Sequence, residues 1–221
     1  PERHDFELTT SRDQTTFNLL VFGDIHLARR HNDLAQFPRF ADDINKYISE
    51  HQSEVFYAVT LGDMVHDQYW IPNNFGFLEY KEELKRLNGL PVFQTIGNHD
   101  HSIAYNTEEG AVIEYRENLG PNYFSFNIGN AHFIALDNIN CTTDKEGLNV
   151  GSFNTHKYAV NIAGEQMEWL KKDLDAVEDK ENKLIIMCVH IPLRGTGNSS
   201  KNYKAVVNEM LKFKEAHVLS G

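Results

Sequence analysis

Four short apolar runs of this 221-residue sequence each lead directly into residues that could do chemistry. Gly23-Asp24-Ile25-His26 follows the first run, Gly62-Asp63 the second and Gly97-Asn98-His99-Asp100 the third, and the fourth run ends at His190. In open α/β sheets, functional sites form beyond the carboxyl ends of the strands. We therefore expect these four segments to bring Asp, Asn and His side chains together at one edge.

The expected side chains combine carboxylate, imidazole and amide oxygen atoms. This mixture suits Mn, Fe or Zn better than an all-oxygen calcium site. Asp24 and His26 lie two positions apart on a chain that leaves a strand, so both can reach one ion. Two divalent ions fit the set better than one. Ions ~3.5 to 4 Å apart are held by a bridging carboxylate, and a bridging hydroxide attacks phosphorus in line.

The elements that must position these residues follow a β-α-β rhythm. Five apolar runs read as strands buried on both faces, at Phe17–Phe22, Val55–Leu61, Pro91–Ile96, Leu184–Val189 and Val218–Ser220. Helical periodicity falls between them, at Leu34–His51, Phe77–Leu87, Gly164–Val177 and Tyr203–Phe213. The alternation predicts a parallel sheet.

The middle of the chain departs from this rhythm. Tyr123–Ile128, a Gly129-Asn130 step and Ala131–Asp137 predict a hairpin, and hence a second sheet. The polar stretch from Asn138 to Lys157 has no periodicity and is long enough for a functional loop.

Composition narrows the class of protein. The net charge of -11 argues against binding to duplex nucleic acid, which needs clustered Lys and Arg. No apolar run approaches the ~18 residues of a membrane span. Two cysteines, Cys141 and Cys188, form no disulfide framework, and Cys188 inside its apolar run should act as a small hydrophobic residue.

The ordered motifs GDxH, GD and GNHD, followed by the strand-ending His190, resemble those of the calcineurin-like metallophosphoesterases, and bacterial phosphohydrolases in particular. The resemblance extends from Phe17 to Gly221. It implies an α/β fold, a four-layer α/β/β/α sandwich of two mixed β-sheets flanked by helices. It also implies a dinuclear metal site between the sheets.

The same resemblance implies a role for each site residue. The implied metal ligands are Asp24 and His26 for one ion, Asp63 as the bridge, and Asn98 and His190 for the other ion. His99 is the implied proton donor, and a His with a pKa near ~6.5 can protonate a departing alkoxide at neutral pH. The acid that orients His99 is either Asp67 or Asp100, and the sequence does not distinguish them.

One departure from the pattern concerns the substrate. Protein phosphatases of this superfamily place the orienting acid three residues after the bridging Asp and follow it with a phosphate-binding Arg. This chain has His66 and Asp67 at those positions, which argues against phosphoprotein hydrolysis. Arg29 and Arg30 fit a phosphate clamp and ordinary surface charge equally well. We expect His66, His101 and Asp67 to line the cleft without binding metal directly.

The family's final motif, Gly-His-x-His, follows a short apolar strand, whereas here Val218–Ser220 leads to the last residue, Gly221. We therefore expect residues 16–221 to form a metallophosphoesterase domain that is incomplete at its C-terminus. Polar residues 1–15 are expected to be a linker or leader. Flanking domains of a longer chain are expected as partners, and an exported or periplasmic location is favoured over the cytoplasm.

The sequence thus predicts a metal-dependent phosphoesterase acting on a small phosphorylated substrate, either a monoester or a diester, with His99 as general acid. The alternative is a catalytically silent module that has kept the fold and binds a ligand or partner domain.

Overall fold

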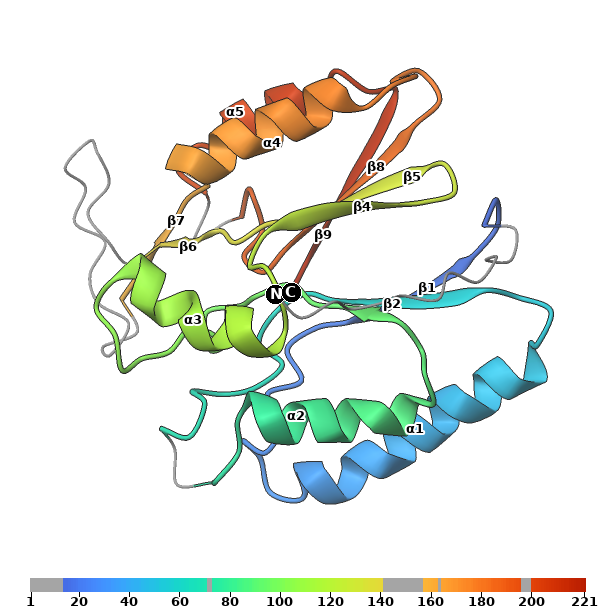
Figure 1. Cartoon of the computed structure of the whole chain (residues 1–221), viewed down its shortest axis with the longest axis vertical. Helices are drawn as coiled ribbons and strands as arrows, with labels where there is room; N and C mark the ends of the chain where they lie inside the picture. The colour runs from blue at the N-terminus through green and yellow to red at the C-terminus, as the bar shows by residue number, and fades with distance from the viewer. Residues whose placement is uncertain (1–13, 71–72, 141–156, 163, 196–199) are drawn as a thin grey trace, which may run out of the picture.

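The computed structural model describes residues 14–70, 73–140, 157–162, 164–195 and 200–221. Two β-sheets face one another in it, and helices cover their outer sides (Figure 1). The first sheet contains β1 (Asn18–Phe22), β2 (Phe56–Thr60) and β3 (Val92–Phe93). The second contains β4 (Phe124–Ile128), β5 (Ala131–Ala135), β8 (Leu184–Val189) and β9 (Glu215–Ser220).

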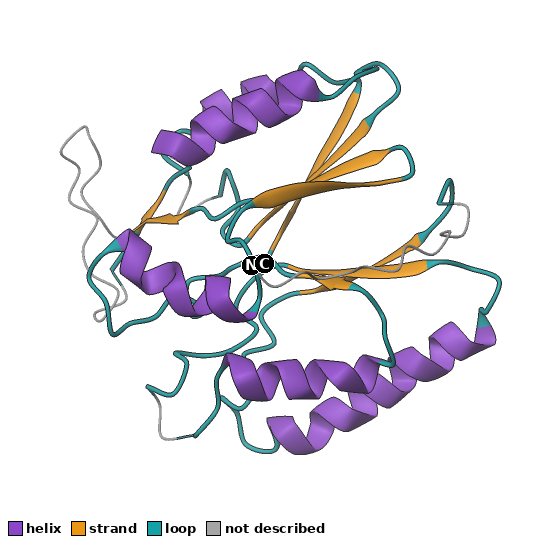
Figure 2. Ribbon diagram, viewed as in Figure 1, coloured by secondary structure: helices purple, strands orange, loops and turns teal. Residues whose placement is uncertain are grey.

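Helices form the two outer layers (Figure 2). On the side of the first sheet lie α1 (Asp33–Glu50) and α2 (Phe77–Leu84), which continues into the 3₁₀ turn η1 (Lys85–Leu87). On the side of the second sheet lie α4 (Gly164–Ala176) and α5 (Tyr203–Met210). The predicted α/β/β/α arrangement of four layers is confirmed.

The five predicted strands divide between the two sheets. The first three runs pair in parallel in the order β1-β2-β3, so the described strands of this sheet are not mixed. The last two runs join the predicted hairpin in the order β4-β5-β8-β9. Only the β4–β5 pair of this second sheet is antiparallel, which makes the sheet mixed. The residues expected at one sheet edge therefore come from two sheets that face each other.

Two local predictions differ from the structure. The predicted strand Pro91–Ile96 contains only the two residues of β3, because the backbone N–H of Thr95 donates to the side chain of Thr60 instead of extending the ladder. The helix α3 (Glu108–Asn118) was not expected. Gly110 within its first turns obscures the helical pattern, although the Thr107 side chain accepts a hydrogen bond from the Gly110 N–H and caps the helix.

The predicted loop from Asn138 to Lys157 begins inside a short antiparallel pair, β6 (Ile139–Asn140) with β7 (Ala159–Val160). Residues 141–156 lie outside the described part, as do residues 1–13 of the predicted linker.

Apolar residues fill the space between each pair of layers. The cluster between the two sheets includes Val59 of β2, Phe133 of β5 and Cys188 of β8, each at most 3% exposed. One aromatic stack crosses this interface, since Phe93 of β3 stacks on Phe126 of β4 at 3.8 Å between ring centroids. Within the second sheet, Phe126 stacks in turn on Phe133 at 4.9 Å. Cys188 packs in this apolar cluster, which confirms the prediction that it acts as a small hydrophobic residue, and burial raises the pKa of its thiol to about 12.

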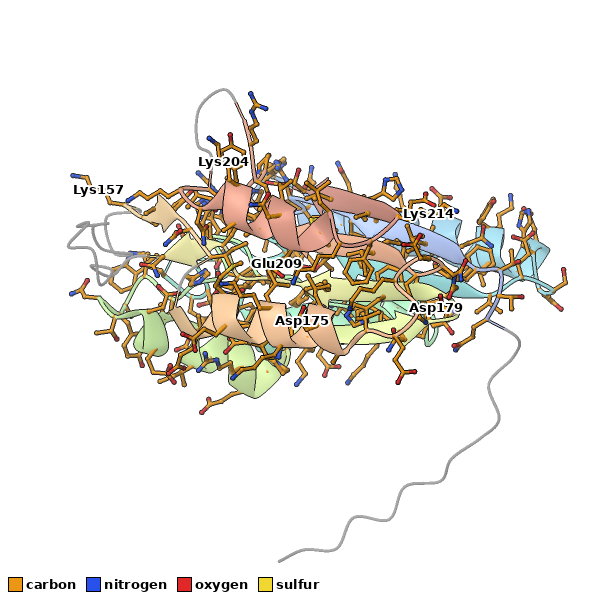
Figure 3. All side chains as sticks on the ribbon, turned by 90° about the horizontal axis from the view of Figure 1, so that it is seen from above. Lys157, Asp175, Asp179, Lys204, Glu209 and Lys214 are labelled. Atoms are coloured by element: carbon orange, nitrogen blue, oxygen red, sulfur yellow. The ribbon has the colours of Figure 1, made fainter. Side chains whose placement is uncertain are left out.

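The outer surface carries much of the charge. Seen from above, charged side chains lie along α4 and α5, among them Asp175, Lys204 and Glu209 (Figure 3). Lys212 pairs with Asp175 at 2.8 Å and bridges the two helices. Within the described residues, every helix is too short or too polar to cross a bilayer.

The inter-sheet core gives a stability prediction. Phe133→Ala should destabilise the fold by roughly 3 to 5 kcal/mol, because a fully buried ring leaves a cavity between the sheets. Urea unfolding followed by circular dichroism measures the change. Leu211→Ala is the control, because Leu211 is 73% exposed and should change stability by less than about 0.5 kcal/mol. Equal losses in both variants would show that the inter-sheet core is not what holds the layers together.

Candidate metal centre

The ends of β1, β2, β3 and β8 meet between the two sheets, where glycines allow close contact. Gly62 has a φ of +91°, and a Cβ there would lie 2.7 Å from both the Cα of Gly97 and the Nδ1 of His190. A Cβ on Gly97 would lie 2.2 Å from Asp63 Oδ1. No larger residue fits at either position without moving the backbone. These two glycines therefore let strands from both sheets deliver their side chains to one place.

Two groups of potential ligand atoms share the carboxylate of Asp63. His26 Nε2 lies 3.6 Å from Asp24 Oδ1 and 3.6 Å from Asp63 Oδ2. His190 Nε2 lies 3.2 Å from the same Asp63 oxygen and 2.9 Å from Asn98 Oδ1. The structure thus brings together all five predicted metal ligands and places Asp63 between the two groups. Asp24 is the exposed member, while Asp63, Asn98 and His190 are buried.

The orientation of His190 is fixed by the backbone. Its Nδ1 lies 2.9 Å from the carbonyl oxygen of Leu61, which can only accept, so Nδ1 carries a proton. Nε2 consequently faces Asp63 and Asn98, which is the arrangement that metal-binding histidines commonly show. Burial works against the charged imidazole, but the Asp63 carboxylate raises the pKa of His190 to about 9. A metal ion bound at Nε2 would replace that proton.

Four of the predicted site residues adopt left-handed backbone conformations. The φ angles are +50° for Asp24, +47° for His26, +55° for Asp63 and +49° for Asp67. Residues with a Cβ are uncommon in this region, and such conformations concentrate at functional sites. Backbone bonds between strand ends support them, including His26 N–H to Asp63 O at 2.9 Å. The strained backbone conformations thus occur at the place where the site side chains converge, and hydrogen bonds between the strand ends stabilise them.

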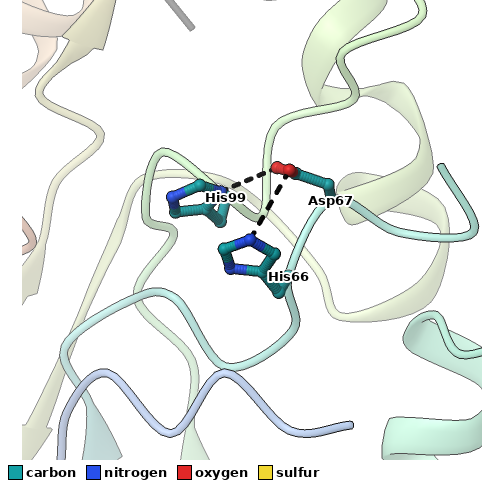
Figure 4. Close-up of side chains that lie close together, drawn as sticks. All are labelled: His66, Asp67 and His99. Atoms are coloured by element: carbon teal, nitrogen blue, oxygen red, sulfur yellow. Dashed lines mark hydrogen bonds and ion pairs between the residues drawn. The ribbon is translucent and has the colours of Figure 1, made fainter. Parts of the chain in front are cut away.

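His99 lies beside this group and is oriented by Asp67 (Figure 4). Its Nδ1 lies 2.7 Å from Asp67 Oδ1, and its backbone N–H donates to Asp63 Oδ1 at 2.8 Å. Burial alone would lower the pKa of His99, but the hydrogen bond to Asp67 and the charge of Asp63 raise it above 6.5. Asp67 is therefore the acid that contacts His99.

Asp100, the other acid considered for that role, contacts backbone instead of His99. Its carboxylate accepts the N–H groups of Asp63 at 2.8 Å, Val65 at 3.2 Å and Gly97 at 2.8 Å. It is 2% exposed, and burial together with the Asp63 charge raises its pKa to about 7. Asp100 thus ties the segment after β3 to the segment after β2.

His66, which was expected only to line the cleft, belongs to the same network. Its ring stacks on His99 with centroids 4.0 Å apart, and its Nδ1 lies 2.9 Å from the Nδ1 of His26. Arg29 donates to His66 Nε2 at 3.1 Å. Burial and the neighbouring positive charge of His99 lower the pKa of His66 to about 4. A neutral ring therefore occupies the position where the resemblance anticipated an acid.

Gly221, the last residue of the sequence, lies beside the two groups of potential ligand atoms. Gly221 N–H donates to the carbonyl of His190 at 3.0 Å. A Cβ on Gly221 would lie 2.7 Å from Asp24 Oδ2 and 2.9 Å from His190 Nδ1. The strand β9 thus ends beside both ligand groups.

Sequence reasoning missed one acid near the site, Asp137. It follows β5 and lies 3.1 Å from Nε2 of the buried His101. The signal was present, because Asp137 ends an apolar run in the same way as the other site residues. The same run predicts the second strand of the hairpin, and Asp137 lies at the end of that strand rather than in one of the four motifs.

The donor atoms suit a transition-metal or zinc site. Each group offers imidazole nitrogen with carboxylate or amide oxygen, a mixture that favours Mn, Fe or Zn. Asp24, His26 and Asp63 each offer a ligand atom, all within 4.8 Å of one another. The residues present therefore fit a metal centre of this chemistry.

Comparisons with known proteins agree with this geometry. The family model described as calcineurin-like phosphoesterase matches residues 17–221. A curated relative, serine/threonine-protein phosphatase CPPED1 from Pongo abelii, is 26% identical over 142 residues, which are 62% of this chain and 40% of that protein. A purple acid phosphatase, PPD1, isolated from yellow lupin seeds, shares the fold with a TM-score of 0.58 and 14% identity, over 92% of this chain and 37% of its own. Each match thus covers less than half of the other protein's length.

The His99–Asp67 contact gives a prediction for the metal-free protein. Asp67→Asn should lower the pKa of His99, because the variant removes the carboxylate that stabilises the imidazolium. A pH titration of the His99 ring by NMR measures it. The matched control is Asp173→Asn, which alters a similar pair away from the site, Asp173 of α4 with His132 of β5 at 2.9 Å. An unchanged His99 pKa in Asp67→Asn would contradict the assigned pairing.

Proposed function

The chain belongs to the calcineurin-like phosphoesterase family, and from this premise we propose that it is a phosphoesterase that uses two divalent metal ions to hydrolyse a small phosphomonoester or phosphodiester. The observation that carries the proposal is the position of Asp63 Oδ2, 3.6 Å from His26 Nε2 and 3.2 Å from His190 Nε2. One carboxylate oxygen between two imidazoles is the arrangement that a bridging ligand requires.

The ligand assignment follows from the two groups. Asp24 and His26 would hold one ion, Asn98 and His190 the other, and Asp63 would contact both. Mn, Fe and Zn are the ions that this donor set favours. When bound, such ions lower the pKa of water towards neutrality and stabilise charge on phosphate oxygens. Because His190 Nδ1 and the Asp63 backbone are held by hydrogen bonds, the ligands are positioned before any ion binds.

His99 would act as the general acid. Asp67 holds its Nδ1, so Nε2 is the ring nitrogen directed to donate a proton to the leaving oxygen. The hydrogen bond to Asp67 and the charge of Asp63 raise the pKa of His99, which widens the pH range over which the ring carries its proton. Since a general acid must carry its proton, the rate should fall as the pH rises through that pKa.

The named relatives and the residues beside His99 favour a small phosphate ester as the substrate. Both similar proteins are named phosphatases, which supports a phosphate ester as substrate. Asp67 is the acid partner of His99. In the protein-phosphatase pattern this acid stands one residue earlier, at the position that His66 occupies here. The phosphate-binding Arg of that pattern is still missing, because Gln68 follows Asp67. A small phosphate ester therefore fits better than a phosphoprotein.

Two substitutions test the separate roles of ligand and acid. Asp63→Asn should abolish turnover and loosen both ions, because it weakens the shared ligand. His99→Gln should keep the metal while lowering kcat by roughly 10²- to 10⁴-fold, as expected for loss of a general acid. Hydrolysis of an aryl phosphomonoester, an aryl phosphodiester and a phosphopeptide with added Mn, together with metal content, measures both effects.

The wild-type chain and any longer natural form serve as references in these assays. Equal metal loss in the two variants would refute the role of His99 as an acid that binds no metal. If no form of the protein shows metal-dependent turnover, the proposed enzyme is wrong and a silent binding module is the better account.

A further inference from the structure

We propose that His101 is a positioning residue that holds the Asn98–His99 segment in place by fixing the carbonyl of Gly97 from an anchor in the second sheet, Asp137. The inference rests on the proposed function, because Asn98 and His99 are there a metal ligand and the general acid. It assigns a role to a side chain that was expected only to line the cleft.

His101 makes two contacts, one through each ring nitrogen. The ring is completely buried, and its Nδ1 lies 2.8 Å from Gly97 O. Because a carbonyl oxygen only accepts, Nδ1 carries the proton of that bond. On the other side of the ring, Nε2 lies 3.1 Å from Asp137 Oδ2. One side chain thus links the loop after β3 to Asp137, the second residue after β5.

Gly97 is the residue on which the loop turns. Its N–H donates to Asp100 Oδ2 at 2.8 Å, while its carbonyl accepts from His101 Nδ1 at 2.8 Å and from the backbone N–H of Asp100 at 3.2 Å. Side chains therefore hold both of its backbone polar groups, and the contact with Asp63 leaves no room for a Cβ. Asn98 and His99 follow directly, so any rotation of the Gly97 peptide would move a ligand and the acid together.

The anchor is itself firmly held. Asp137 Oδ2 accepts from Asn122 Nδ2 at 2.9 Å, and Oδ1 accepts from the N–H of Ile139 at 3.1 Å. Its backbone N–H and carbonyl both bond to the side-chain amide of Gln166 on α4, at 2.9 and 2.7 Å. The anchor therefore belongs to the second sheet and its covering helix. Through it, His101 ties that layer to the loop of the first sheet.

The same cluster could be taken for a third ion site, because Glu108 Oε1 lies 3.9 Å from His101 Nε2. A proton on Nε2 accounts for the contact without an ion. Burial disfavours the charged ring, but Asp137 and Glu108 raise the pKa of His101 to about 9. A protonated His101 is satisfied by Gly97 and Asp137, so we favour the positioning role.

Two substitutions separate the two contacts of the ring. In His101→Asn, the amide nitrogen can replace Nδ1 and keep the bond to Gly97, while the contact with Asp137 is lost. In His101→Gln, the longer amide can replace Nε2 and keep the contact with Asp137, while the bond to Gly97 is lost. The control is His132→Gln, which removes a buried His bonded to Asp173 away from the loop.

Hydrogen exchange of residues 97–101 in the metal-free chain is the first measurement. His101→Gln should raise exchange there by at least about tenfold, whereas His101→Asn and His132→Gln should change it less. The second measurement is kcat with saturating Mn, which should fall by roughly 10- to 100-fold in His101→Gln with KM little changed, as for other residues that orient a metal ligand. Equal effects of the two His101 variants, or loop exchange unchanged in His101→Gln, would overturn the proposal.

A measurement on the wild-type chain covers the case in which neither variant folds. Selective ¹⁵N-histidine NMR should show a slowly exchanging proton on His101 Nδ1, and rapid exchange would contradict the bond to Gly97. Metal analysis tests the alternative that His101 binds an ion. If the wild-type chain holds an additional ion that both His101→Asn and His101→Gln lose, His101 is a metal ligand and the positioning proposal is wrong. Hydrogen exchange is measured without metal or substrate, so it tests the positioning role of His101 independently of the proposed enzyme activity. The positioning role can be correct even if the protein shows no turnover, and it can be wrong even if the protein is active.

Discussion

The Asp63 carboxylate is the constraint on which the rest of the site depends. Its Oδ2 faces His26 and His190, while its Oδ1 accepts the backbone N–H of His99. Such a buried carboxylate is costly unless its oxygens are paired. The site pairs Oδ2 with imidazoles from both sheets and Oδ1 with a backbone N–H, and the Asp100 carboxylate accepts the backbone N–H of Asp63. Everything around Asp63 thus serves to keep one charged group between two histidines.

The two sheets contribute unequally to this arrangement. The first sheet supplies Asp24, His26, Asp63 and the loop with Asn98 and His99, while the second supplies His190. The apolar layer between the sheets, with Phe133 at its centre, sets their separation. Polar contacts such as His190 to Leu61 O then set the register of one sheet's end against the other. Packing brings the layers together, and hydrogen bonds place the reactive groups within them.

Much of this organisation could be predicted from the sequence, because strand ends leave a local mark. Polar residues at the ends of apolar runs, after a Gly in three of the four cases, marked all five proposed ligands, and the hairpin at Gly129-Asn130 indicated the second sheet. What could not be predicted depends on long-range contacts. The choice of Asp67 over Asp100 as partner of His99 depends on the left-handed turn at Asp67, and the role of Asp137 depends on a contact across the sheets. The sequence marks Asp137 as the end of an apolar run, but no pattern in a single sequence shows which side chain it contacts, or which of the two acids faces His99.

The central claim is that Asp63 joins two metal-binding groups. Anomalous diffraction from crystals soaked in Mn tests it most directly, because it locates each ion independently of activity. The account predicts two peaks about 3.5 to 4 Å apart, one beside Asp24 and His26, the other beside Asn98 and His190, with Asp63 in contact with both. A single peak that does not touch Asp63, or peaks only elsewhere in the molecule, would contradict it.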